Sequence, residues 1–182
     1  MRKTILSLMV SLDGYYVGPG NGFEQIDWHL VEHEWDEFAV ELLGRADMLL
    51  FGRRTFTEFS GFWPSQSGPI ADGLRDTHKT VYSKTLSEAG WVNARLARDP
   101  IDDVKRLKKL PGKDMVIFGS GTLARALLDA DLLDEVRLAI NPVALGSGKT
   151  FLPEDGMRRH FAHKDTHSFT NGVVMLTLEP AR

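Results

Sequence analysis

The turn between residues 119 and 124 has the residue types and spacing of a phosphate-binding loop. It consists of Gly119, Ser120, Gly121, Thr122, Leu123 and Ala124. An apolar run at 115–118, typical of a buried strand, precedes it, and a helical pattern extends from 122 to about 130. Glycine lets backbone amides approach an anion closely, and a helix N-terminus favours negative charge. The turn therefore predicts a phosphate site, the alternative being a tight strand-to-helix turn without a ligand.

Two other nucleotide motifs fit the sequence poorly. A Rossmann NAD fingerprint needs an acid at the end of the next strand, about 20 residues on, but the strand pattern over 136–143 reaches Asn141 there. The run Gly148-Lys149-Thr150 resembles the end of a Walker A loop. However, Val143 stands where that motif requires glycine, and Pro153 opposes a following helix. A strict NAD fingerprint and a nucleoside-triphosphatase loop are both disfavoured.

Cations and hydroxyls follow two further strand patterns. Gly52, Arg53, Arg54 and Thr55 follow the apolar run 48–51. The strand pattern 80–83 ends with Ser83, and Lys84 follows it. Guanidinium groups match phosphate oxygens bidentately, and a helix start adds its backbone amides. The alternative is a set of solvated surface cations. Their position at strand ends favours a second anion site, because ligands of parallel sheets bind outside the carboxyl ends of the strands.

Histidine and cysteine chemistry has little support. His29 and His33 are one helical turn apart, but no H-E-x-x-H motif is present and no third metal ligand can be placed, so a solvated polar face is expected. His160 does not share strand parity with His163 and His167. Neither a G-x-S-x-G elbow nor any cysteine occurs, so no hydrolase, thiol or metal site is predicted.

These residues need a parallel sheet to bring them together, and the pattern predicts one. Strands are expected near 3–11, 48–51, 80–83, 91–96, 115–118, 136–143, 160–169 and 173–179; helices near 29–43, 55–62, 70–75, 100–110 and 122–130. Alternation of strands and helices indicates an α/β fold with a mostly parallel sheet covered on both faces. Asn171-Gly172 predicts an antiparallel hairpin at the C-terminal end. Without repeats or linkers, residues 1–182 are expected to form one domain.

Composition narrows the function further. The chain has 182 residues, a formal net charge of −3 and no cysteine, which excludes disulfides, cysteine-ligated zinc and iron–sulfur clusters. The charge balance argues against nucleic-acid binding. No apolar run approaches the roughly 18 residues of a membrane span. The N-terminal apolar stretch is interrupted by Ser7 and leads into Asp13-Gly14, so a core strand and a cytoplasmic protein are expected, without a signal peptide.

Taken in order, the turns resemble those of the dihydrofolate reductase superfamily, and most closely the reductase domain of bifunctional riboflavin-biosynthesis deaminase–reductases and its stand-alone relatives. The motifs that carry the resemblance are Ser11-Leu12-Asp13-Gly14, Gly52-Arg53-Arg54-Thr55-Phe56, Phe62-Trp63-Pro64, Tyr82-Ser83-Lys84, Phe118-Gly119-Ser120-Gly121-Thr122-Leu123, Gly146-Ser147-Gly148 and Phe151-Leu152-Pro153. They span roughly residues 3–178. The resemblance implies a dihydrofolate-reductase-like domain and an NADPH-dependent reductase.

The resemblance also implies roles for the predicted anion sites. Arg53 and Thr55 would hold the pyrophosphate and the adenosine 2′-phosphate, with Arg54 as a second cation. Ser83, with Lys84 beside it, would assist at the 2′-phosphate. The turn from Gly119 to Thr122 would carry the diphosphate and the nicotinamide side.

On the substrate side, the resemblance places Asp13 and the loop up to Gly22 beside the substrate and the nicotinamide. Asp36 is the implied proton donor, with Glu32 and Glu37 as rivals, and it should be partly buried with a raised pKa. The alternative is a solvated acid on an acidic helix. A small heterocyclic or imine-like substrate of pterin or ribosylaminopyrimidine type is expected, and a homodimer.

Two departures leave the substrate open. The zinc ligands of the deaminase half are absent from this sequence. Residues that bind the ribosyl phosphate in the riboflavin enzymes have no clear match. A nucleotide-binding or interaction module without reductase activity is the alternative function.

Overall fold

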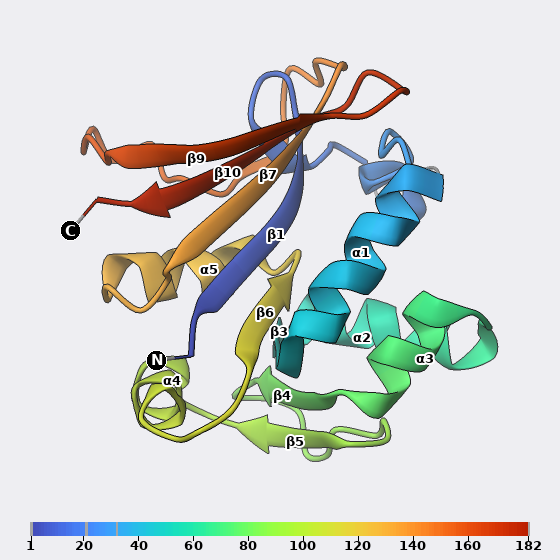
Figure 1. Ribbon diagram of the computed structural model, residues 1–182, viewed down its shortest axis with the longest axis vertical. Coiled ribbons are helices and arrows are strands. Elements are labelled where there is room, and N and C mark those ends of the chain that lie inside the picture. Colours follow the sequence, from blue (N-terminus) through green and yellow to red (C-terminus); the bar gives the residue numbers. More distant parts are fainter. Residues whose placement is uncertain (1, 21, 32, 182) are drawn as a thin grey trace.

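Continuous apolar runs form the centre of an eight-stranded sheet in the computed structural model, which describes residues 2–20, 22–31 and 33–181 (Figure 1). The strand order is β5-β4-β3-β6-β1-β7-β10-β9. The strands are β1 (Thr4–Ser11), β3 (Ala46–Gly52), β4 (His78–Tyr82), β5 (Ala94–Ala97), β6 (Asp114–Phe118), β7 (Glu135–Asn141), β9 (Phe161–Ser168) and β10 (Val174–Pro180). The first six run parallel, and β10 is antiparallel to both β7 and β9. The predicted mostly parallel sheet with a terminal hairpin is confirmed.

Helices cover both faces of this sheet because the central strands are apolar at consecutive positions, and successive side chains point to opposite faces. The helices are α1 (His33–Arg45), α2 (Arg53–Phe62), α3 (Pro69–Asp76), α4 (Pro100–Lys108) and α5 (Gly121–Asp129), with short 3₁₀ segments η1 (Gly22–Gln25) and η2 (Trp63–Ser65). Leu6 and Leu8 of β1 pack into one core with α4 and α5. Ile5 of β1 packs into a second core with α1, α2 and α3.

Most element boundaries follow the predicted ones, with one instructive difference. Helix α1 begins at His33, four residues after the predicted start. Residues before it are held in another way: His29 N–H donates to the Ile26 carbonyl at 3.0 Å, and Leu30 N–H donates to Asn141 Oδ1 at 2.9 Å. Asn141 is fully buried at the end of β7. The segment before α1 is therefore attached to the carboxyl edge of the sheet.

Two small features lie outside the predicted pattern. A second, two-stranded sheet pairs β2 (Tyr15–Val17) with β8 (Lys149–Thr150), so the residues that resemble a Walker A loop lead into a strand. In the hairpin, the pairing of β9 with β10 shifts by one residue at Lys164. No helix in the described part of the chain is both long enough and apolar enough to cross a bilayer.

Candidate functional site

The two predicted phosphate turns lie side by side at the carboxyl edge of the sheet. Strands β3 and β6 are neighbours, so Gly52 and Gly119 end up next to each other. The Ser120 hydroxyl accepts a hydrogen bond from Gly52 N–H at 3.1 Å, and Ser120 N–H donates to Thr55 Oγ1 at 3.3 Å. Ser120 thus links two motifs that are far apart in the sequence, through its side chain to Gly52 and through its backbone N–H to Thr55.

The turn after β6 has a backbone that few sequences can adopt. Gly119 has a φ of +61°, and Ser120 is in the left-handed conformation with φ 48° and ψ 43°. Left-handed backbone is uncommon for a residue other than glycine and gathers at functional sites. At Gly121 a Cβ atom would lie 2.7 Å from the Tyr16 ring, so only glycine fits without moving that ring.

Helices α2 and α5 both begin at this edge with their first amides open. Neither has a side-chain cap, and neither has an acidic residue in its first turn. In contrast, the Asp99 carboxylate caps α4, accepting from Ile101 N–H and Asp102 N–H. Uncapped N-terminal amides and the positive end of the helix dipole favour an anion. The site can therefore hold two phosphate groups close together.

The cations predicted for this site lie along the same edge. Arg53 and Lys84 are exposed. Arg54 forms an ion pair with Glu58 at 3.1 Å and donates to the Gln25 side chain, so it is engaged within the chain. The Ser83 hydroxyl is buried, accepts from the amides of Thr85 and Leu86, and lies 3.5 Å from the Thr85 hydroxyl, so it is engaged within its own turn.

Arg98 is a site residue that sequence reasoning missed. Strand register places Gly52 beside Tyr82 and Tyr82 beside Ala97. The residues that directly follow these three strands therefore lie in one row across the sheet: Arg53, Ser83 and Arg98. Arg98 is exposed, and its Nη1 donates to the Ser83 carbonyl. The strand predicted over 91–96 ends at Ala97 in the structure. With that end, Arg98 is the first residue after the strand, which is the position that marks a candidate site residue.

Asp13 is part of a loop anchor. Its carboxylate accepts hydrogen bonds from Ser11 Oγ at 2.6 Å and from the amides of Leu145 and Gly146. The Ser11 and Gly146 hydrogen bonds lower the pKa of Asp13 to about 2. A carboxylate held in this way fixes the loop after β7 to the loop after β1, and it is a weak proton donor near neutrality.

Asp36 does not meet the burial expected of a proton donor. Asp36 lies in the first turn of helix α1, and its side chain is exposed, whereas Ala39 and Leu42 further along the helix are buried. The expectation that it is partly buried in a cleft is wrong. Its rival Glu37 is also exposed, and Glu32 lies outside the described residues.

His29, expected on a solvated face, is largely buried instead. Its ring stacks edge-on against Trp28 at a centroid distance of 4.3 Å. Its buried Nε2 has no hydrogen-bond partner in the described structure. Burial lowers the pKa of His29 to about 4, with a small opposing effect from Asp27. No local pattern distinguishes it, because its burial depends on contacts made after folding.

The sequence is similar to those of known proteins along nearly its whole length. A family model described as the RibD C-terminal domain matches residues 2–175. The uncharacterized protein YyaP of Bacillus subtilis (strain 168) is 31% identical over 180 residues, covering 96% of this chain and 93% of YyaP. YwjB of the same organism, also uncharacterized, is 25% identical over 179 residues, covering 96% of both.

Solved structures agree in fold. A putative riboflavin biosynthesis protein from Shewanella sp. PV-4 superposes with a TM-score of 0.71 at 21% identity, covering both chains completely. The Thermotoga maritima diaminohydroxyphosphoribosylaminopyrimidine deaminase/5-amino-6-(5-phosphoribosylamino)uracil reductase gives a TM-score of 0.69 at 12% identity, covering 99% of this chain and 57% of that one. By the match of the family model over residues 2–175, the chain belongs to the RibD C-terminal domain family, and its fold is dihydrofolate-reductase-like.

Proposed function

We propose that the protein is an NADPH-dependent reductase that transfers hydride to a small heterocyclic or imine-like substrate, of pterin or ribosylaminopyrimidine type. The observation that carries this proposal is the pair of uncapped helix N-termini joined through Ser120. Membership of a reductase-domain family supports it.

The residues at the edge fit a dinucleotide with separate anionic groups. Amides at the starts of α2 and α5, with Thr55 and Thr122, would hold the diphosphate. Arg53, Lys84 and Arg98 would face the 2′-phosphate. Arg53 follows β3 and Arg98 follows β5, and β4 lies between these two strands, so their backbones are about 10 Å apart at ordinary strand spacing. One phosphate group can lie between two long side chains at that separation. NADPH would supply hydride from its nicotinamide ring.

The nicotinamide end would lie beside the part of β1 that pairs with β7 and no longer with β6. Residues Thr4–Ser7 of β1 pair with β6, but pairing with β7 continues to Ser11. Beyond Ser7, β1 therefore has an open side next to the Gly119 turn. Such points, where neighbouring strands separate at their carboxyl ends, are where ligands of α/β sheets bind. The chain would orient the ring there and exclude water.

Binding of the cofactor is tested directly by thermal unfolding. NADPH at 100 times its dissociation constant should stabilise the protein by about 2.7 kcal/mol, which raises Tm by roughly 5–10 °C. NADH and ATP should give smaller shifts, and Arg53→Ala should remove the preference for NADPH. If neither nicotinamide cofactor raises Tm, the reductase proposal is rejected.

Arg98→Gln should weaken NADPH binding about tenfold and leave NADH binding unchanged, because NADH lacks the 2′-phosphate. The matched control is Arg95→Gln, since Arg95 is paired with Asp103 at 2.6 Å and lies within β5. Isothermal titration with both cofactors measures the ratio. An equal loss for NADPH and NADH would show that Arg98 supports the turn at Ser83 and does not contact the 2′-phosphate.

One observation favours the alternative of a nucleotide-binding module without reductase activity. Asp13 is held as an anchor and Asp36 is exposed, so neither provides a sheltered proton donor. NADPH binding without NADPH oxidation in a screen of dihydropterins, pterins and aminopyrimidines would support the module. We also propose a homodimer, which light scattering after gel filtration would test.

A further inference from the structure

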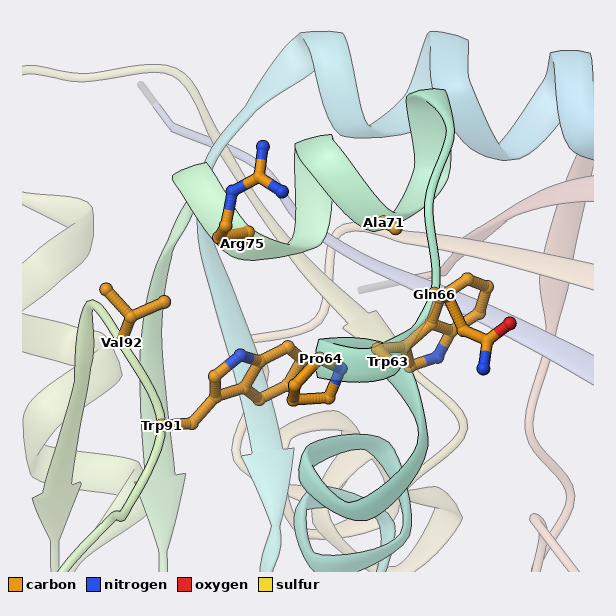
Figure 2. Close-up of a pocket in the computed structure, with 7 residues that line it drawn as sticks. All are labelled: Trp63, Pro64, Gln66, Ala71, Arg75, Trp91 and Val92. Atoms are coloured by element: carbon orange, nitrogen blue, oxygen red, sulfur yellow. The ribbon is translucent and has the colours of Figure 1, made fainter.

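A cavity lies away from the phosphate turns, beside the amino end of β4. Its volume is about 270 Å³, and its walls come from η2, α3 and the segment before β5. Figure 2 shows Ala71 and Arg75 on α3 on one side of the opening and Trp91 and Pro64 on the other, with the Arg75 guanidinium directed away from Trp91. Helix α2 leads away from the carboxyl end of β3, and α3 leads into the amino end of β4. The pocket is therefore separate from the proposed cofactor site.

Contacts behind the pocket hold its aromatic wall in place. The Lys79 ammonium lies 4.8 Å from the centre of the Trp91 ring. Lys79 is itself almost fully buried and donates to the carbonyls of Leu74, Arg75 and Thr77. Phe56 packs against Trp91 at a centroid distance of 5.9 Å. The Trp91 ring is thus fixed before any ligand arrives, which lowers the ordering cost of binding.

The small residue Ala71 leaves the space open. Ala71 is buried on α3 and lines the cavity. A larger apolar side chain at this position would fill the cavity. On the far side, Trp63 packs edge-on against Phe62 at 5.3 Å. Two indole rings thus border a cavity slightly smaller than the usual pockets for drug-sized ligands, so it suits one or two fused rings.

The polar groups around the pocket are mainly donors. Among the described residues, no hydrogen bond uses the indole N–H of Trp63 or Trp91, whereas that of Trp28 donates to Gln25. Arg75 pairs with Asp72 at 2.7 Å and with Asp76 at 3.3 Å, so its charge is already balanced. The pocket therefore offers N–H donors without a net positive charge.

We infer that this pocket binds a neutral, planar heteroaromatic compound of one or two fused rings with hydrogen-bond acceptors on one edge. The indole rings of Trp63 and Trp91 supply the apolar contact. Their N–H groups supply the donors that such an edge requires. The carboxylates of Asp72 and Asp76 disfavour an anionic ligand. The small volume of the cavity disfavours a ligand of more than two fused rings.

The four tryptophans make the test direct, because each indole N–H gives its own signal in a ¹H–¹⁵N spectrum. Titration with quinazolin-4-one should shift the signals of Trp63 and Trp91 and leave those of Trp28 and Trp35 in place. Indole, similar in size but without an acceptor, should bind at least tenfold more weakly. Equal binding of the two probes, shifts confined to Trp28 or Trp35, or no shift would overturn the inference.

Two variants check the position of the ligand. Ala71→Leu should abolish the shifts by filling the pocket, whereas Ala162→Leu, the same change at an exposed residue of β9, should keep them. If Ala71→Leu does not fold, Trp91→Phe keeps a ring but removes an N–H, and it should weaken quinazolin-4-one at least threefold with indole unchanged. Binding that survives in the folded variant contradicts the assignment. NADPH binding should be unaffected, because the two sites are separate.

Discussion

Arg137→Met is expected to lower the free energy of unfolding by about 3–5 kcal/mol. Arg137 and Glu135 form an ion pair on β7 at 2.7 Å, and both side chains are more than nine-tenths buried. Burial alone would raise the pKa of Glu135, but the hydrogen bond from Arg137 holds it below its ordinary value. Removing the guanidinium leaves a buried carboxylate whose one remaining cationic partner among the described residues is Lys3. Urea unfolding followed by circular dichroism measures the loss.

The variant should also loosen α1, since the Arg137 guanidinium lies 5.2 Å from the centre of the Phe38 ring. Lys164→Met is the control: Lys164 pairs with Glu179 at 3.0 Å, but its side chain is half exposed. That change should cost less than about 1 kcal/mol. Equal losses of unfolding free energy for the two variants would show that the buried Arg137–Glu135 pair stabilises the protein no more than the exposed Lys164–Glu179 pair does.

Acidification should destabilise the protein through His29. Its pKa is about 4 in the folded chain and near 6.5 in the unfolded chain. Between these values the unfolded state binds more protons, so stability present above pH 6.5 is lost as the pH falls toward 4. The loss from this one group is about 3 kcal/mol. Urea unfolding of the wild type and His29→Phe between pH 7 and 4 should show a steeper decline for the wild type.

Phenylalanine retains a ring against Trp28, and no hydrogen bond of Nε2 is lost in the described structure. The same substitution at exposed His160 controls for replacing a histidine. Parallel pH profiles for the wild type and His29→Phe would show that the imidazole is not buried in solution. Because Leu30 is attached to Asn141 at the end of β7, acid loosening should begin at the carboxyl edge.

Local patterns were enough to predict the strand ends and turns that build the site. Gly119–Thr122 and Gly52–Thr55 were identified because a strand, a glycine and a helix start occur within a few residues. Their contact through Ser120 could not be derived in this way. It depends on β6 entering the sheet between β3 and β1, and chain order does not reveal that position.

The sequence does not predict the environment of residues whose burial or position depends on contacts between distant segments. The sequence predicts the apolar stripe on α1, but the exposure of Asp36 depends on how the first turn of this helix packs in the folded chain. His29 was assigned to the same polar face, although the chain there is held by Asn141 before the helix begins. Arg98 was overlooked since its position depends on the register of three strands. Periodicity within a segment contains none of this information.

The one-residue shift at Lys164 has a consequence for how copies of the protein meet. Strand β9 is the last strand of the sheet, and its side chains are almost all exposed. A long straight edge of this kind would add strands from other molecules without limit and form fibrils. The bulge interrupts the row of free amides and carbonyls, and it places a lysine at the break. Growth by edge-to-edge pairing is therefore blocked, so a closed dimer at this end would have to rely on side-chain packing.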